Sequence, residues 1–187
     1  MKIKFIAILS VLAIATLLGT SFYLVHEDNH YAETDTLRGE SLYVINVSND
    51  KELVGASTDV FIGKVIEQVG TSDEPYLRTH FSVEVIETIK GNATGKVIVN
   101  QAGGYETVDG KKYLSLMEED ELLQPGETYL FSARGNDERG YTFVPGYGDL
   151  LIKNQTDYQN KVQRFQKAHS EEIPFDPYKN RTTINQE

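Results

Sequence analysis

Between residues 58 and 144 the sequence is a series of short segments with the two-residue period of β-strands, separated by turns that contain glycine. Residues 79–89 are the clearest of these segments, because Phe81, Val83 and Val85 alternate with more polar neighbours over this stretch. A strand of this kind buries one face and exposes the other, which favours a sheet that closes around a core. The pattern therefore constrains the chain to a β fold.

Two turn signals divide this region further. Asp109-Gly110 is typical of a two-residue hairpin, and Pro125-Gly126 marks a second turn. Short strands at this spacing indicate a small barrel or sandwich. We predict a mainly β fold in which residues 58–145 form a closed five-stranded barrel. Its predicted core includes Val60, Ile62, Val83, Val85, Val97, Val99, Leu130 and Val144.

One short helix before the barrel and one helix after it are also predicted. Asn49 with Glu52 fits a capping box for a helical turn from Lys51 to Ala56. Thr156 with Gln159 fits a second capping box at the start of the closing helix. The apolar face of that helix has the spacing i, i+4 and i+7 and consists of Tyr158, Val162 and Phe165.

The N-terminal 25 residues predict an address outside the cytoplasm. Lys2 and Lys4 precede an uncharged apolar run from Phe5 to Val25, which as a helix measures about 31 Å and matches the bilayer core. The lysines place the N-terminus inside and the remaining chain outside. A membrane anchor and a cleaved signal peptide that ends near Gly19 and Ser21 both fit this pattern, and we favour the uncleaved anchor.

Four segments follow from these features. Residues 1–25 are the anchor or signal peptide, and residues 26–48 are a polar stalk. Residues 49–170 form the single domain. Residues 171–187 contain two prolines and many polar residues, which predicts a disordered tail.

Composition excludes several classes of function. The chain has no cysteine, so it cannot contain a disulfide, a thiolate metal site or a cysteine nucleophile. The first 25 residues hold two of the 18 basic residues and none of the 28 acidic ones, which leaves a net charge of −12 on the exported part. Such an acidic chain is not expected to bind nucleic acid, because phosphate recognition needs basic residues.

Three sequence blocks, taken in order, resemble the tissue inhibitor of metalloproteinases and netrin-like domains. The blocks run from Ala56 to Val65, from Phe81 to Gly91 and from Pro125 to Phe131, and the resemblance covers roughly residues 49–170. It implies a five-stranded OB-like barrel flanked by helices. The order and spacing of the three blocks, rather than any single block, carry the resemblance.

The resemblance carries no inhibitory residue over to this chain. Animal inhibitors of this family chelate the protease zinc through the α-amino group and carbonyl of an N-terminal cysteine. This chain lacks cysteine, and its domain is preceded by further residues. The resemblance therefore implies the fold alone.

No established catalytic motif occurs in the sequence. The metalloprotease, nucleophile-elbow, phosphate-loop and calcium-loop patterns are all missing, and the four histidines are scattered. His80 lies in an alternating strand, where a structural role is the expectation. The acidic run Glu118–Glu121 offers oxygen ligands for calcium, but a solvated loop is the favoured interpretation. We predict no catalytic residue, no metal site and no cofactor.

Two loops are candidate binding sites because each places a tyrosine beside glycines. Glycine allows close approach of a ligand to the backbone, and tyrosine offers a flat amphipathic face. Ordinary strand-end turns are the favoured alternative. The candidate residues are Gly103, Gly104 and Tyr105 in the first loop, and Pro145, Gly146 and Tyr147 in the second.

These features predict a non-catalytic binding or interaction module held at the cell surface. Its expected partner is another extracytoplasmic protein, and its expected membrane contact is the N-terminal segment. Two alternatives stay open: a secreted protease inhibitor that works without the family's cysteine, and a hydrolase with dispersed catalytic residues.

Overall fold

The computed structural model describes residues 34–136 and 138–176. The chain divides into two compact units, Met1–Thr34 and Asp35–Glu187, and every element below belongs to the second unit. The predicted N-terminal anchor lies outside the described residues. Among the residues that are described, no helix has the length and apolar character needed to cross a membrane.

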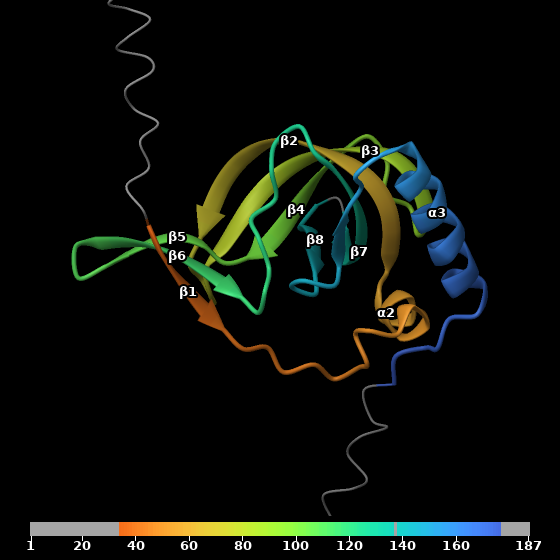
Figure 1. Cartoon of the computed structure of the whole chain (residues 1–187), viewed down its shortest axis with the longest axis horizontal. Helices are drawn as coiled ribbons and strands as arrows, with labels where there is room; N and C mark the ends of the chain where they lie inside the picture. Colours follow the sequence, from red (N-terminus) through yellow and green to blue (C-terminus); the bar gives the residue numbers. More distant parts are fainter. Residues whose placement is uncertain (1–33, 137, 177–187) are drawn as a thin grey trace, which may run out of the picture. The chain divides into compact units, whose positions relative to one another are not determined.

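Five strands close into a barrel and confirm the predicted fold class. They are β2 (Asp59–Ser72), β3 (Arg78–Lys90), β4 (Lys96–Ala102), β7 (Thr128–Asn136) and β8 (Gly140–Phe143). The order around the ring is β2-β3-β4-β8-β7, and pairing of β7 with β2 closes it (Figure 1). The β4–β8 pair is parallel and the others are antiparallel. This is an OB-like barrel.

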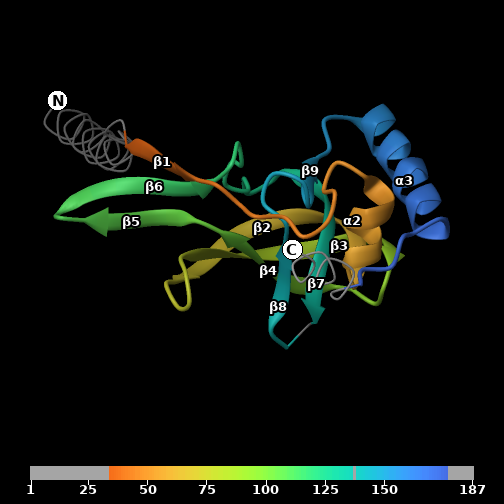
Figure 2. The ribbon, with the colours of Figure 1, turned by 90° about the horizontal axis from the view of Figure 1, so that it is seen from below.

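A second sheet and one further strand flank the barrel. The second sheet has the order β1 (Asp35–Gly39), β6 (Lys111–Met117), β5 (Gly104–Val108), with β1 parallel to β6. Figure 2 shows the β5–β6 hairpin extending away from the barrel strands, with β1 beside β6. Asp109 and Gly110 both have positive φ, 51° and 78°, which is the backbone of the predicted hairpin turn. The short strand β9 (Asp149–Leu151) pairs with β7.

The barrel interior is more aromatic than predicted. Phe61 packs against Phe131 and Tyr141 with ring centroids 5.3 and 5.4 Å apart, and Phe143 lies 5.9 Å from Phe131. The predicted Val83, Val97 and Val99 belong to this interior cluster. Val85 only packs against its edge.

The remaining predicted core residues lie in a different layer. Val60, Ile62 and Leu130 are fully buried, but they belong to a second cluster formed between the barrel and the helices. Strand alternation explains the division, because Val60 and Ile62 face opposite to Phe61. Val144 is partly buried and packs against the same second cluster. Six of the eight predicted core residues are therefore buried, in two layers rather than one, whereas Val85 and Val144 are only partly buried.

Helices α2 (Asp50–Ala56) and α3 (Gln155–Ser170) cover that second cluster (Figure 1). The first cap is confirmed, since Asn49 Oδ1 accepts from the amide of Lys51 at 3.1 Å. The second was placed wrongly: Asn154 caps α3 by accepting from the amide of Asp157 at 3.0 Å. Asparagine is as good a cap as threonine, and it stands two positions earlier. The predicted face Tyr158, Val162 and Phe165 does pack on the cluster.

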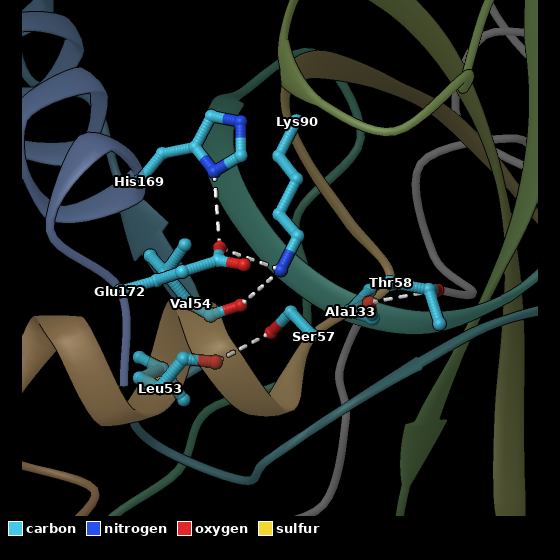
Figure 3. Close-up of polar contacts among 8 residues, drawn as sticks. All are labelled: Leu53, Val54, Ser57, Thr58, Lys90, Ala133, His169 and Glu172. Carbon is cyan, nitrogen blue, oxygen red and sulfur yellow. Dashed lines mark hydrogen bonds and ion pairs between the residues drawn. The ribbon is translucent and has the colours of Figure 1, made fainter. Parts of the chain in front are cut away.

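Residues beyond α3 are attached to the domain. Figure 3 shows the carboxylate of Glu172 between Lys90 Nζ, at 2.8 Å, and His169 Nδ1, at 3.0 Å. Lys90 also donates to the carbonyl of Val54 at 2.8 Å, and the amide of Ile173 donates to the carbonyl of Lys51 at 3.0 Å. The domain thus continues past the predicted boundary at 170, while residues 177–187 lie outside the described residues.

Candidate functional site

The first candidate loop makes a tight crossing of the chain over itself. A Cβ atom on Gly103 would lie 2.4 Å from the carbonyl oxygen of Ser115, and one on Gly104 would lie 2.4 Å from Thr79 Oγ1. Both glycines have positive φ, 100° and 146°. These positions need glycine because the chain leaves β4 for β5 against its own backbone. Close approach of a ligand is not required to explain them.

The second candidate loop is attached to the segment that follows β1. The Tyr147 ring meets the Tyr43 ring edge to face, with centroids 5.6 Å apart. The Tyr43 hydroxyl donates to the carbonyl oxygen of Pro145 at 3.4 Å. Gly146 has φ +69° and open space around it, as expected of a turn. The loop therefore contacts the segment between β1 and α2 through Tyr43.

A groove of about 910 Å³ brings the two loops together, since Gly103 and Pro145 both line it. We call this the apolar groove. Its lining residues come from the barrel, from β6 and from the chain that leads from β1 towards α2. Figures 1 and 2 show that this chain runs along the barrel. Its charged lining residues are Arg38 and Glu40. The apolar lining includes Leu37, Leu42, Tyr76, Leu116, Met117 and Phe143.

The other candidate residues lie outside the apolar groove. Gly104 and Tyr105 belong to β5, where Lys112 Nζ lies 4.5 Å from the centroid of the Tyr105 ring. Tyr147 packs on Tyr43, as described above. Gly146 lines a second hollow next to the groove.

This second hollow, which we call the acidic pocket, has a volume of about 350 Å³. Five carboxylate side chains line it together with Leu122, Tyr129 and Leu151. Three of them come from the predicted acidic run and two from later strands and turns. The five are Glu119, Asp120, Glu121, Glu127 and Asp149.

Asp120 shows that the acidic run is not simply a solvated loop. Asp120 is only 4% exposed. Its Oδ2 accepts a hydrogen bond from Gln101 Nε2 at 3.1 Å, and its Oδ1 accepts one from the amide of Glu121 at 3.0 Å. Burial raises the pKa of Asp120, while these hydrogen bonds oppose that shift. In the described part of the chain, no three His, Asp or Glu side chains converge in a way that would hold a metal ion.

Asp149 is the residue that sequence reasoning missed in this pocket. Its Oδ1 atom is fully buried and has no hydrogen-bond partner among the described residues. Burial raises the pKa of Asp149 well above its usual value, and the negative charge of Asp120 raises it further. Nothing in the local sequence signals this burial, because it depends on the pairing of β9 with β7.

Arg38 joins the two hollows. Its Nη1 donates to the carbonyl oxygens of Glu118 and Asp120, at 2.7 and 3.0 Å. Arg38 lines the apolar groove and Asp120 lines the acidic pocket, so the second of these hydrogen bonds links a lining residue of one hollow to a lining residue of the other. Pro145 lines the groove and its chain neighbour Gly146 lines the pocket, which gives a second link between the two hollows.

His80 is the centre of a separate polar network. Its Nδ1 lies 2.6 Å from Asn100 Oδ1 and its Nε2 lies 3.0 Å from Ser72 Oγ. An amide oxygen only accepts, so Nδ1 carries a proton, and in the neutral imidazole the serine then donates to Nε2. This connectivity is that of a serine nucleophile with its base. However, neither Ser72 nor His80 lines the apolar groove or the acidic pocket, so the network has no substrate cavity there.

Comparison with known proteins assigns no role to any of these residues. No model of a known protein family matches the chain, and no curated protein matches it. The resemblance to the metalloproteinase-inhibitor and netrin-like domains therefore rests on the three sequence blocks. Its structural expectation, an OB-like barrel with flanking helices, is what the fold shows.

Proposed function

We propose that this chain is a non-catalytic binding module that faces the outside of the cell and engages an extended segment of another extracytoplasmic protein. The apolar groove is the observation that carries the proposal. Its volume, about 910 Å³, lies within the range of sites that bind ligands of substantial size. Its lining is mostly apolar, which suits burial of a partner's side chains.

The rim of the groove supports a docking role. Leu42 is fully exposed, and Leu37 and Tyr76 are nearly half-exposed, at 45% and 48%. Apolar side chains gathered around a hollow in this way are typical of interaction surfaces. In addition, β1 is an edge strand, and its residues Leu37 to Gly39 line the groove. An edge strand favours a partner in extended conformation.

The groove's own chemistry favours binding over catalysis. The lining has two charged residues, Arg38 and Glu40. Arg38 already donates hydrogen bonds to two backbone carbonyls, and Glu40 is the acidic residue of the lining. General acid–base catalysis needs titratable groups that converge on a substrate, and this lining does not supply a pair.

Photo-crosslinking tests the docking role. Benzoylphenylalanine replaces Leu42 at the groove rim in one variant and Ile86, a half-exposed residue on β3, in the control. We expect a discrete crosslinked partner from Leu42 only, and the purified partner should bind the Leu42→Asp variant at least tenfold more weakly. Equal crosslinking from both positions would contradict the proposal.

The absence of cysteine allows a direct test of location. In a Val108→Cys variant the new thiol is unique and lies on an exposed position of β5. A maleimide that cannot cross membranes should label it in intact cells, and fractionation should recover the chain in the membrane at its unprocessed mass. Labelling only after lysis would place the domain inside. A soluble form that begins near Phe22 would instead favour the signal peptide.

A further inference from the structure

We propose that the acidic pocket receives the cationic end of an arginine or lysine side chain from the partner that docks in the apolar groove. This inference rests on the proposed function and adds the chemistry of the partner. The partner segment would then present an apolar side chain to the groove and a basic one to the pocket.

The charge of the pocket is of one sign. Its lining contains five carboxylate side chains and no lysine, arginine or histidine. Arg38 lies outside the lining and is held by the carbonyls of Glu118 and Asp120. A hollow with carboxylate walls concentrates cations, and the effect is stronger where water is partly excluded.

The unsatisfied acceptor is Asp149 Oδ1. This buried oxygen has no hydrogen-bond partner among the described residues, whereas both carboxylate oxygens of neighbouring Asp120 have one. A buried acceptor without a partner is unfavourable for the isolated protein. Rotation of the Asp149 carboxyl group towards a charged N–H donor in the pocket relieves this unfavourable state with a strong hydrogen bond.

The shape and lining distinguish an organic cation from a metal ion. Leu122, Leu151 and the ring of Tyr129 line the same hollow, so the aliphatic stem of lysine or arginine has apolar surface to contact. The volume of about 350 Å³ accommodates a whole side chain. Within the described ranges, no three acidic or histidine side chains converge as metal ligands, which disfavours a bare divalent cation.

The position of the pocket links it to the groove. Pro145 lines the groove and its chain neighbour Gly146 lines the pocket, so one extended segment can reach both. Successive side chains of an extended strand point in opposite directions. A partner segment that alternates apolar and basic residues therefore fits this pair of hollows.

The test is an NMR titration of the full chain in neutral detergent micelles with Nα-acetyl-arginine methylamide. Saturable shifts are expected for the amides of Gly146, Asp149 and Glu121. The citrulline analogue has nearly the same shape but no charge, and it should leave these signals unmoved. Asp149→Asn should weaken the arginine affinity at least tenfold, whereas Glu84→Gln, at an exposed acid outside the pocket, should leave it unchanged.

Three outcomes would overturn the inference. They are equal shifts with citrulline, an Asp149→Asn variant that binds as well as the parent, and calcium shifting these amides when the arginine probe does not. The failure of the inference is distinguishable from failure of the proposed function. If Leu42 still crosslinks a partner while the arginine probe fails, only the identity of the partner's side chain is wrong.

Discussion

Lys90 and Glu172 form an ion pair, with 2.8 Å between Nζ and Oε2, that joins the end of β3 to the residues after α3. Lys90 Nζ also donates to the carbonyl of Val54 in α2. One ammonium group therefore links the barrel, the short helix and the C-terminal segment (Figure 3). This arrangement explains why the chain after α3 follows the domain surface.

Glu172→Gln should lower the free energy of unfolding at pH 7 by about 1 kcal/mol, since the pair is only partly exposed. The hydrogen bond from Lys90 lowers the pKa of Glu172, against burial that raises it. A lowered carboxyl pKa gives stability above the unfolded pKa of about 4.3, and this stability is lost as pH falls through the folded pKa.

Urea unfolding curves of the variant and the parent should differ at pH 7 and converge in acid. Glu171→Gln is the control, because the Glu171–Lys51 pair is nearly half-exposed. A larger effect from Glu171 would contradict the assignment.

The side chain of Asp59, at the start of β2, binds the turn that follows β3 at Gly91. Both residues lie in the three sequence blocks, but the sequence does not show that they meet. Asp59 Oδ1 accepts from the amides of Asn92 and Ala93 at 2.7 and 3.1 Å. Gly91 has φ +83°, and a Cβ there would lie 2.2 Å from that oxygen. Asp59→Ala should therefore destabilise the protein by about 2–3 kcal/mol, because the buried amide of Ala93 and the part-buried amide of Asn92 both lose a charged acceptor.

Gly91→Ala should destabilise the protein more than Gly95→Ala, and calorimetry can compare them directly. Both glycines have positive φ, 83° and 62°, so both substitutions incur the conformational penalty of about 1 kcal/mol. Only Gly91 has atoms in the way, whereas Gly95 has none within 4 Å. Equal melting temperatures would show that the loop at Gly91 relaxes freely.

The sequence predicted those strands and turns whose conformation depends on residues close together in the chain. Phe81 and Val83 show the alternation of β3, and Asp109-Gly110 has the positive φ values that a tight hairpin turn requires. By contrast, β1 gave no signal. All five of its residues are exposed, so their side chains carry no apolar period, and the strand is held by its parallel pairing with β6.

The burial of individual side chains and the make-up of the candidate site depend on tertiary packing, which the sequence pattern does not show. Val60 alternates as strongly as Val83, but whether its face is covered by helices or by the barrel interior depends on where α2 and α3 pack. Gly103 and Pro145 belong to two separate candidate loops of the sequence, and the folded chain places them in one groove. Asp149 carries no motif, and its burial follows from the β7–β9 pairing.

Asp149→Asn should stabilise the protein at pH 7.5 by about 1–3 kcal/mol, because a neutral amide replaces an ionisable carboxyl group that has a buried, unpaired oxygen. Because burial raises the pKa of Asp149, the folded state holds this proton more tightly than the unfolded state does. The parent therefore loses stability as pH rises above the unfolded pKa of about 3.9. The gain in melting temperature should be present at pH 7.5 and absent at pH 3.5. Asp157→Asn should have the opposite sign at pH 7.5, because the hydrogen bond from Lys161 lowers the pKa of Asp157.

The last prediction is that the full chain in neutral micelles will not inhibit zinc proteases by chelating their metal. Chelation in the family that the sequence resembles needs a free α-amino group, but residues 43–48 of this domain are continuous chain. The amides of Asn46 and Ser48 already donate hydrogen bonds, to Glu52 Oε2 at 3.0 Å and Asn46 Oδ1 at 3.2 Å. An amide nitrogen has no available lone pair for zinc.

The two nearest carboxylates are also engaged. Arg164 donates to both oxygens of Asp50 at 2.5 Å, and Glu52 accepts from Asn46 and Asn49. Either side chain would have to give up these contacts to reach a zinc ion. A panel of zinc proteases assayed with micromolar protein should therefore keep full activity. Potent inhibition that disappears in an Asp50→Ala, Glu52→Ala double variant would show instead that these carboxylates bind the metal, and would make the chain a protease inhibitor.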